Sequence, residues 1–290
     1  MRAFIAGATG QLGRELVRLL GERVVFAGGS RELDVRDGDA VARIIRGTRP
    51  NVVFNASAFN DVDGAETSPH EAFAVNSCGP LHLARAAAEN GALFVHVSTD
   101  YVFDGNADSP YTEDDTPHPI SVYGATKLAG EQLVEQIECP SLIVRTSGLF
   151  GAGGSRIKGG SFVDRVLAKA RTGKPLMVVG DQVFSPTYAP DLAAALLGLI
   201  QKSARGLFHV SNGGAISWHG LAVAALEQAG LKVEVKQIRT LDLGARARRP
   251  AHSVLSKERF TGLGIAPLRS WRDALEEYMV VLGARPSVEA

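Results

Sequence analysis

The sequence predicts an α/β protein with a doubly wound parallel sheet, followed by a smaller C-terminal domain of mixed α/β structure. In the first half, short apolar runs alternate with helical patterns, which implies parallel strands joined by right-handed crossovers. Each run has the length of a strand that is buried on both faces. The five predicted strands are Ala3–Ala6, Val24–Ala27, Val52–Asn55, Leu93–Ser98 and Leu142–Thr146.

Four helices are predicted between and after these strands. Their ranges are Leu12–Leu20, Asp37–Arg46, Pro69–Ala88 and Val122–Glu138. The third has a clear start, because Ser68 can cap it, Pro69 stands at the first helical position and Glu71 completes a capping box. Pro80 should kink this helix or divide it in two.

After residue 147 the alternation loosens. We expect residues 1–147 to form a dinucleotide-binding domain and residues 148–290 to form mainly a substrate-binding domain, with segments from about 175 to 210 returning to the sheet. The glycine-rich stretch Gly151–Gly160 predicts a mobile loop. The elements predicted in this half are helices at Phe162–Thr172, Leu192–Gln201, Leu221–Ala229 and Trp271–Leu282 and strands at Met177–Val179, Leu207–Val210 and Val233–Gln237.

The composition is that of an ordinary globular protein. Lys plus Arg and Asp plus Glu both number 31, so net charge gives no reason to expect nucleic acid or an anionic membrane as a partner. No signal peptide or membrane-spanning run is recognisable, and the expected location is the cytoplasm. Cys78 and Cys139 lack metal-ligand spacing and are expected to be buried; no metal site is predicted.

A phosphate-binding loop is predicted directly after the first strand. Gly7, Gly10 and Gly13 follow one another at three-residue intervals in GATGQLG and lead into the first helix. A sharp strand-to-helix turn favours residues without a Cβ. Backbone N–H groups and the dipole at a helix start favour a pyrophosphate. The position of the triplet after an N-terminal strand therefore indicates a Rossmann-type dinucleotide site.

The end of the second predicted strand bears on the choice of cofactor. It reads Ala27-Gly28-Gly29-Ser30-Arg31, with no acidic residue at its tip. An acid there would hold the ribose 2′-hydroxyl of NAD, whereas arginine suits the 2′-phosphate of NADP. Arg31 favours NADPH, with NADH as the alternative, although a solvated loop arginine would give the same sequence.

Carbonyl reduction is the chemistry that the next set of residues indicates. Tyr123 and Lys127 lie at i and i+4 of a predicted helix and so share one face. A tyrosine hydroxyl can give a proton to the reduced carbonyl, and a neighbouring ammonium would lower its pKa. Thr99, at the end of the fourth strand, can donate a hydrogen bond to the oxygen that gains charge. We therefore predict Tyr123, Lys127 and Thr99 as the catalytic residues.

Several motifs together resemble the dTDP-4-dehydrorhamnose reductase family of the extended short-chain dehydrogenase/reductases. They occur in order along nearly the whole chain: NASA (55–58), VDGAE (62–66), STDYVFDG (98–105), PYTE (110–113), VYGATKLAGE (122–131), DQ (181–182), PT (186–187) and RRP (248–250). The resemblance implies NAD(P)H-dependent reduction of the C4 keto group of dTDP-4-dehydro-L-rhamnose to dTDP-L-rhamnose, and it allows a homodimer.

The resemblance also assigns site residues. Those implied for the cofactor, beside the glycines of the loop, are Gln11, Leu12, Asp34, Val35, Ala58, Phe59, Asn60, Tyr123 and Lys127. Those implied for the nucleotide sugar are Thr99, Asp100, Tyr123, Gly148 and Arg249. Two of these have alternatives in the residues themselves: Asp34 can be a helix-start residue, and Arg249 part of a solvated charge run.

The chain departs from the family at three places. Family members usually have tryptophan, which packs on the sugar, where this chain has Gly148; they have His or Tyr and then Thr at Phe59-Asn60, and glycine at Phe184. The missing indole predicts a wider pocket and a looser sugar preference, unless Trp218 or Phe150 fills the space.

Two further functions remain open from the sequence. One is a reductase of another nucleotide-linked keto-sugar. The other is a non-catalytic subunit like the regulatory subunit of methionine adenosyltransferase, which shares the fold and much of the SDYVFDG and YxxxK pattern. Thr99, where that subunit tends to have serine, and the DQ…PT segment favour the reductase.

Overall fold

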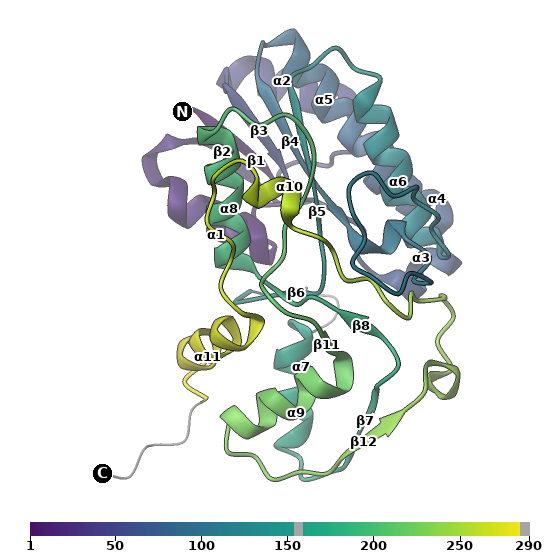
Figure 1. The fold of residues 1–290 in the computed structure, drawn as a ribbon. Coiled ribbons are helices and arrows are strands. Elements are labelled where there is room, and N and C mark those ends of the chain that lie inside the picture. The colour runs from purple at the N-terminus through teal and green to yellow at the C-terminus, as the bar shows by residue number, and fades with distance from the viewer. Residues whose placement is uncertain (154–158, 285–290) are drawn as a thin grey trace.

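The computed structural model describes residues 1–153 and 159–284, and a six-stranded parallel sheet forms its centre (Figure 1). The strands are β1 (Ala3–Ala6), β2 (Val24–Gly28), β3 (Val52–Asn55), β4 (Leu93–Thr99), β5 (Ser141–Thr146) and β10 (Gly206–His209). They lie in the order β10-β5-β4-β3-β1-β2 and pair in parallel. Because β1 has β2 on one side and β3 on the other, the chain reverses direction there. Such a switch point is where doubly wound sheets bind ligands.

Helices cover both faces of this sheet (Figure 1). On one face lie α1 (Gln11–Leu20) and α8 (Ala189–Gln201), and on the other α2 (Gly38–Thr48), α5 (Gly79–Glu89) and α6 (Val122–Glu135). Successive strand residues point to opposite faces, so Ile5 packs in the core under α1 and α8 whereas Phe4 packs in the core under α2 and α5. The predicted doubly wound architecture is confirmed.

The third predicted helix is divided, as Pro80 suggested. It consists of α4 (Pro69–Phe73), a π-helical turn η2 (Ala74–Cys78) and α5. The predicted capping box is wrong, because the Ser68 side chain makes no hydrogen bond to the helix. Ser68 also closes the preceding helix α3 (Val62–Thr67), through its N–H to Gly64 O, and this fixes its backbone in another conformation. Cys78, expected to be buried, is exposed at the end of the π-helical turn, and Cys139 is partly buried.

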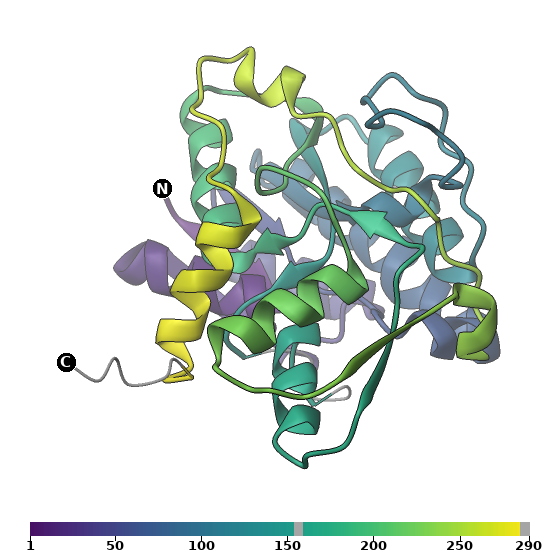
Figure 2. The same ribbon diagram turned by 60° about the horizontal axis from the view of Figure 1, so that its bottom comes forward.

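The second half builds a separate hydrophobic core around three helices (Figure 2). They are α7 (Phe162–Ala170), α9 (Trp218–Gln228) and α11 (Trp271–Val281). Three two-stranded sheets join them: β7 (Leu176–Val179) with β12 (Val235–Ile238), β6 (Leu149–Phe150) with β9 (Thr187–Tyr188), and β8 (Val183–Phe184) with β11 (Ile216–Ser217). The remaining short elements are η1 (Gly21–Arg23), η3 (Asp100–Val102), η4 (Thr240–Leu243) and α10 (Glu258–Thr261).

The return to the main sheet comes later than expected. Of the stretch from about residue 175 to 210, only β10 joins the main sheet, with α8 against its face, whereas β7 pairs with β12. The division at residue 147 stays a prediction. The centre of the glycine-rich stretch, residues 154–158, lies outside the described residues, and so does the mobile loop expected there. Within the described ranges no helix is long and apolar enough to cross a membrane.

A buried ion pair fixes α6 to the sheet. The guanidinium of Arg145, in β5, donates to the carboxylate of Glu131, in α6, with Nη2–Oε2 at 2.7 Å and Nε–Oε1 at 3.0 Å. Both side chains are only 3% exposed. The Arg145 guanidinium also lies 5.1 Å from the centre of the Phe103 ring. Because Glu131 is one turn beyond Lys127, this pair determines where the predicted catalytic face of α6 points.

Removal of the carboxylate should be strongly destabilising. Glu131→Ala leaves the Arg145 charge buried without a partner, and we expect a loss of about 3–5 kcal/mol in the free energy of unfolding, measured by urea denaturation. The matched control is Glu89→Ala, whose carboxylate lies 3.6 Å from Arg46 on the surface, with an expected change below about 1 kcal/mol. Equal losses in the two variants would contradict this account.

Candidate active site

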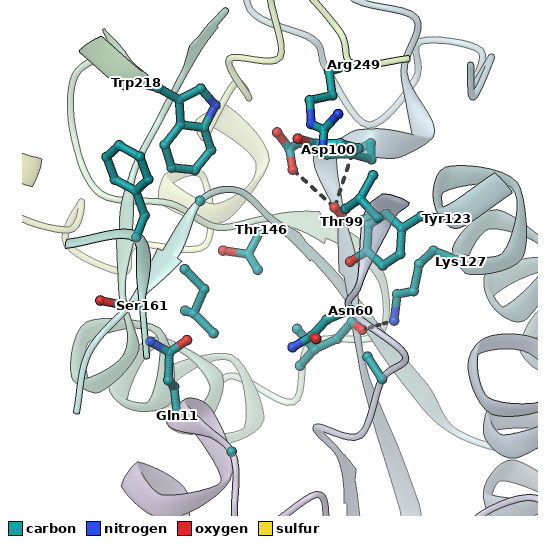
Figure 3. Close-up of a pocket in the computed structure, with 18 of the residues that line it drawn as sticks. Gln11, Asn60, Thr99, Asp100, Tyr123, Lys127, Thr146, Ser161, Trp218 and Arg249 are labelled. Carbon is teal, nitrogen blue, oxygen red and sulfur yellow. Dashed lines mark hydrogen bonds between the residues drawn. The ribbon is translucent and has the colours of Figure 1, made fainter. Parts of the chain in front are cut away.

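A cavity of about 570 Å³ opens at the carboxyl ends of the central strands (Figure 3). This volume suits a small-molecule ligand, for which roughly 300–1,000 Å³ is usual. The predicted site residues that line it are Gly10, Gln11, Leu12, Ala58, Asn60, Thr99, Asp100, Tyr123, Lys127, Gly148 and Arg249. Those that are not among its lining residues are Gly7, Gly13, Asp34, Val35 and Phe59. The cavity therefore brings together all the predicted catalytic and substrate residues, but only part of the predicted cofactor set.

The three glycines of the loop after β1 have different tasks. Gly7 has a φ of +81°, and its N–H donates to Gly28 O at 2.9 Å, which makes the turn out of β1. A Cβ on Gly13 would lie 2.2 Å from Gly7 O, so Gly13 lets α1 approach the turn. Gly10 faces the cavity, and a Cβ there would meet only Gly7 O, at 3.4 Å.

The start of α1 fits the pyrophosphate of a dinucleotide. Gly10 is the N-cap residue, and no side chain caps the helix. The first N–H groups of a helix lack partners within the helix, so an anion beside Gly10 would satisfy them. The open space next to Gly10 is large enough for such a group to approach the backbone.

The outer cofactor residues are arranged differently from the prediction. The Asp34 carboxylate pairs with Arg36, with Nη2–Oδ2 at 2.6 Å, and this hydrogen bond lowers the pKa of Asp34. Val35 is buried, and the N–H and C=O of Phe59 are held by the Asn76 side chain at 2.8 and 3.0 Å. None of these three predicted cofactor residues lines the cavity.

An acidic side chain does lie at the tip of β2, contrary to the sequence-based expectation. The chain turns back after Gly29, and the Glu32 carboxylate accepts a hydrogen bond from Gly29 N–H at 2.9 Å. Arg31, beside it, is exposed. The sequence-based prediction considered only the residues directly after β2, and so it missed Glu32, which the following turn brings back to the end of the strand.

Three hydroxyl groups surround the carboxylate of Asp100. Its carboxylate accepts hydrogen bonds from Ser147 at 2.7 Å, Ser253 at 2.6 Å and Thr99 at 3.1 Å. Burial raises the pKa of Asp100 to about 6, although the three hydroxyls oppose the rise. The Thr99 hydroxyl thus donates to Asp100 and accepts from the N–H of Tyr101 at 3.2 Å.

Tyr123 and Lys127 both face the cavity from α6 (Figure 3). Lys127 is 2% exposed, and its Nζ donates to Val97 O at 2.7 Å. Burial lowers the pKa of Lys127 to about 8, while Glu131 opposes this. Burial also raises the pKa of Tyr123 to about 12, and a hydrogen bond with Thr99 opposes the rise. The Lys127 ammonium donates to Val97 O, and that Lys127 lowers the pKa of Tyr123 stays a prediction.

Arg249 reaches the cavity from the C-terminal segment but is not a solvated charge. Its Nη2 lies 2.6 Å from Oδ2 of Asp63, in α3, and its Nη1 donates to Ala247 O at 3.0 Å. Its side chain is 14% exposed. The VDGAE and RRP motifs therefore meet in one ion pair beside the cavity.

The space expected beside Gly148 is filled. Gly148 has a φ of +50°, and a Cβ there would lie 2.1 Å from Cε2 of Phe184. The prediction that Gly148 leaves open space is wrong, because Phe184 packs against it, a contact that the sequence could not show. Phe150, which the sequence suggested for this space, lies elsewhere and packs on Tyr188 and Tyr278 in the second core.

Further lining residues come from the second half. Ser161, Phe162 and Arg165, around the start of α7, were not predicted as site residues from the sequence. Gln182, from the DQ motif, and Trp218, named above as a residue that could fill the pocket, also line the cavity. Ser161 forms a capping box with Asp164, a local signal for the helix start that says nothing about the cavity. In the two described ranges, no three His, Cys, Asp or Glu side chains are grouped so that they could hold a metal ion.

The buried carboxylate of Asp100 should make stability depend on pH. Its pKa is higher in the folded protein, at about 6, than the usual 3.8, so its contribution is complete below about pH 4 and is lost as the pH rises through 6. A shift of about two units corresponds to about 3 kcal/mol. The stability of wild type relative to Asp100→Asn should therefore fall by about this amount between about pH 4 and pH 7, measured by urea unfolding. A constant difference would contradict the prediction.

Comparison with known proteins agrees with the predicted family. A family model described as "RmlD substrate binding domain" matches residues 1–283. The chain is 41% identical to dTDP-4-dehydrorhamnose reductase of Streptomyces griseus, over 98% of this chain and 95% of that protein. It is 39% identical to the spore coat polysaccharide biosynthesis protein SpsK of Bacillus subtilis, over 96% of each.

Solved structures show the same relationship. The dTDP-4-dehydrorhamnose reductase from Clostridium acetobutylicum superposes with a TM-score of 0.92 at 38% identity, covering 98% of this chain and 100% of the other. The enzyme from Bacillus anthracis, in complex with NADP, gives a TM-score of 0.92 at 35% identity over 97% and 99%. This chain belongs to the dTDP-4-dehydrorhamnose reductase family.

Proposed function

We propose that this protein is an NAD(P)H-dependent reductase that converts the C4 keto group of dTDP-4-dehydro-L-rhamnose into the hydroxyl group of dTDP-L-rhamnose. The observation that carries this proposal is that Tyr123, Lys127 and Thr99 line one cavity together with the uncapped start of α1. The names of the relatives and the NADP complex of one of them support the same reaction.

Tyr123 is the proposed acid. NADPH, when bound, supplies the hydride. Since the pKa of Tyr123 is about 12, its phenol is neutral at physiological pH and carries the proton that the product oxygen needs. Lys127 has three N–H donors, of which Val97 O accepts one. The others are available, in this proposal, for a ribose hydroxyl of the cofactor and for the phenolate that forms.

Thr99 and Asp100 are proposed to orient the substrate. The Thr99 hydroxyl now donates to Asp100, and a short rotation would direct it to the oxygen that gains charge. The carboxylate of Asp100 keeps Ser147 and Ser253 in place at the same edge of the cavity. The Arg249 guanidinium also bonds Ala247 O and the Tyr101 side chain, and of its five N–H donors those that remain suit the pyrophosphate of the sugar nucleotide.

Another keto-sugar nucleotide is the alternative substrate. One relative, 39% identical over 96% of this chain and 94% of its own, is named a probable dTDP-4,6-dihydroxy-2-methyloxan-3-one 4-ketoreductase of Streptomyces antibioticus. The direct test is the loss of NADPH absorbance with dTDP-4-dehydro-L-rhamnose and with related keto-sugar nucleotides. A pull-down with a methionine adenosyltransferase tests the non-catalytic alternative. Binding of the synthetase without NADPH oxidation would refute the reductase.

A cytoplasmic location and a homodimer stay predictions.

Tyr123→Phe should keep cofactor binding and lose most turnover. The ring still packs against Tyr101, with ring centres 5.7 Å apart, but the proton donor is gone. We expect kcat to fall about 10²–10⁴-fold, the usual contribution of general acid catalysis. Tyr101→Phe, which removes the neighbouring hydroxyl, is the matched control and should affect KM more than kcat. A Tyr123→Phe enzyme within about threefold of the wild-type kcat would exclude Tyr123 as the acid.

Gly10→Val should weaken cofactor binding in a folded protein. The φ of Gly10 is −78°, which any residue adopts, so the valine is tolerated by the backbone but projects where the pyrophosphate must approach. We expect at least about a tenfold rise in the Kd for NADPH, equivalent to about 1.4 kcal/mol, measured by fluorescence titration. Gly47→Val, in α2 with nothing near its Cβ, is the control and should bind NADPH normally. An unchanged Kd in Gly10→Val would contradict the proposed position of the pyrophosphate.

A further inference from the structure

Gly148 and Phe184, two of the positions at which the sequence departs from the pattern of the family it resembles, lie against each other in space. A Cβ on Gly148 would lie 2.1 Å from Cε2 and 2.5 Å from Cδ2 of Phe184. The Phe184 ring therefore occupies the room that a side chain at position 148 would need.

Phe184 in turn supports Trp218. The two rings are stacked, with centres 3.9 Å apart and planes at 25°, and Trp218 meets Phe162 edge to face at 4.7 Å. Trp218 and Phe162 line the cavity, whereas Phe184 lies behind them and is 2% exposed. The absence of a side chain at Gly148 thus leaves room for the Phe184 ring, and this ring holds the Trp218 indole at the cavity wall.

Backbone pairing fixes this arrangement. β8 and β11 are antiparallel, with Phe184 opposite Ile216 and Val183 opposite Ser217. Ser217 then caps α9, because its hydroxyl accepts a hydrogen bond from Gly220 N–H at 3.0 Å. The register therefore places Trp218, the first residue of α9, next to Phe184, and its position depends on neither a mobile loop nor an exposed side chain.

The indole lies across the cavity from the catalytic side chains. In Figure 3, Trp218 is on the wall opposite Thr99 and Tyr123, with Thr146 between the two walls. A sugar ring whose carbonyl oxygen reaches Thr99 and Tyr123 would turn its other side to the second wall. The flat apolar surface of an indole suits the C–H face of a hexose and its methyl group.

We propose that Trp218, held by Phe184, is the specificity-determining residue that contacts the sugar ring. The proposal rests on the proposed function, because it concerns the sugar nucleotide in the same cavity. In this proposal, Trp218 of α9 supplies the aromatic surface of the sugar site.

Substitution of Trp218 tests the contact. Trp218→Ala should raise KM for the keto-sugar nucleotide about tenfold and leave kcat within about threefold, because it removes a binding contact and leaves the reacting groups in place. The Kd for NADPH should not change, and Trp218→Phe should recover part of the loss. An unchanged KM in Trp218→Ala would overturn the proposal.

An exchange of both residues tests the coupling. Gly148→Trp alone must displace Phe184, and we expect a raised KM or a loss of folding. Phe184→Gly alone removes the support of Trp218 and should also raise KM. A tryptophan at position 148 strains the backbone in both variants, because the φ of Gly148 is +50°. The double variant Gly148→Trp/Phe184→Gly should still be more stable and bind the sugar nucleotide better than Gly148→Trp, since it removes the overlap with Phe184. If the double variant is as impaired as the sum of the two single changes, the exchange account is wrong.

Fluorescence separates the contact from the reaction. The chain has two tryptophans, so Trp271→Phe leaves Trp218 as the single indole. dTDP-L-rhamnose should change the emission of Trp218 much more than dTDP does, with binding of both confirmed by calorimetry. Equal changes would assign Trp218 to the nucleotide and overturn the proposal. If dTDP-L-rhamnose changes the emission but no keto-sugar is reduced, the proposed reaction fails while the sugar contact stands.

Discussion

The buried carboxylate of Asp100 is the interaction on which the geometry of the cavity depends. It lies where β4 ends and accepts hydroxyl hydrogen bonds from Ser147, just beyond β5, and from Ser253, in the C-terminal segment. The parallel register of β4 and β5 pairs Thr99 with Thr146, which brings Ser147 to the same edge. A buried charge is costly unless its lone pairs are satisfied. Three segments that are distant in sequence must therefore meet at one point, and this point closes one side of the site.

α6 is held to the same two strands by a second set of buried charges. Lys127 donates to Val97 O in β4, and Glu131, one turn later, pairs with Arg145 in β5. The i, i+4 spacing puts both contacts on one helix face. Tyr123, one turn before Lys127, then faces the cavity and lies near Thr99. The position of the phenol is thus set by buried electrostatics as well as by the helix itself.

Local features of the site could be predicted from sequence, and long-range ones could not. The glycine loop and the Tyr123–Lys127 pair are contained within single elements, so their spacing alone indicates their place. Glu32 was missed because a turn returns it to the tip of β2. The contact between Gly148 and Phe184 depends on how two short strands outside the main sheet are packed, and no local pattern encodes that.

Several motif residues that carry the family resemblance stabilise the scaffold and lie outside the cavity lining. The Tyr111 hydroxyl donates to Asp104 at 2.8 Å, and Gly105, with a φ of +85°, leaves no room for a Cβ against Pro250, whose Cα would be 2.5 Å away. These contacts hold the segment that carries Arg249 against the end of β4. Trp218 lies outside all of these motifs, and Phe184 lies between the DQ and PT pairs. The cavity wall that carries Trp218 is therefore built from other segments than those that position Tyr123, Lys127 and Asp100.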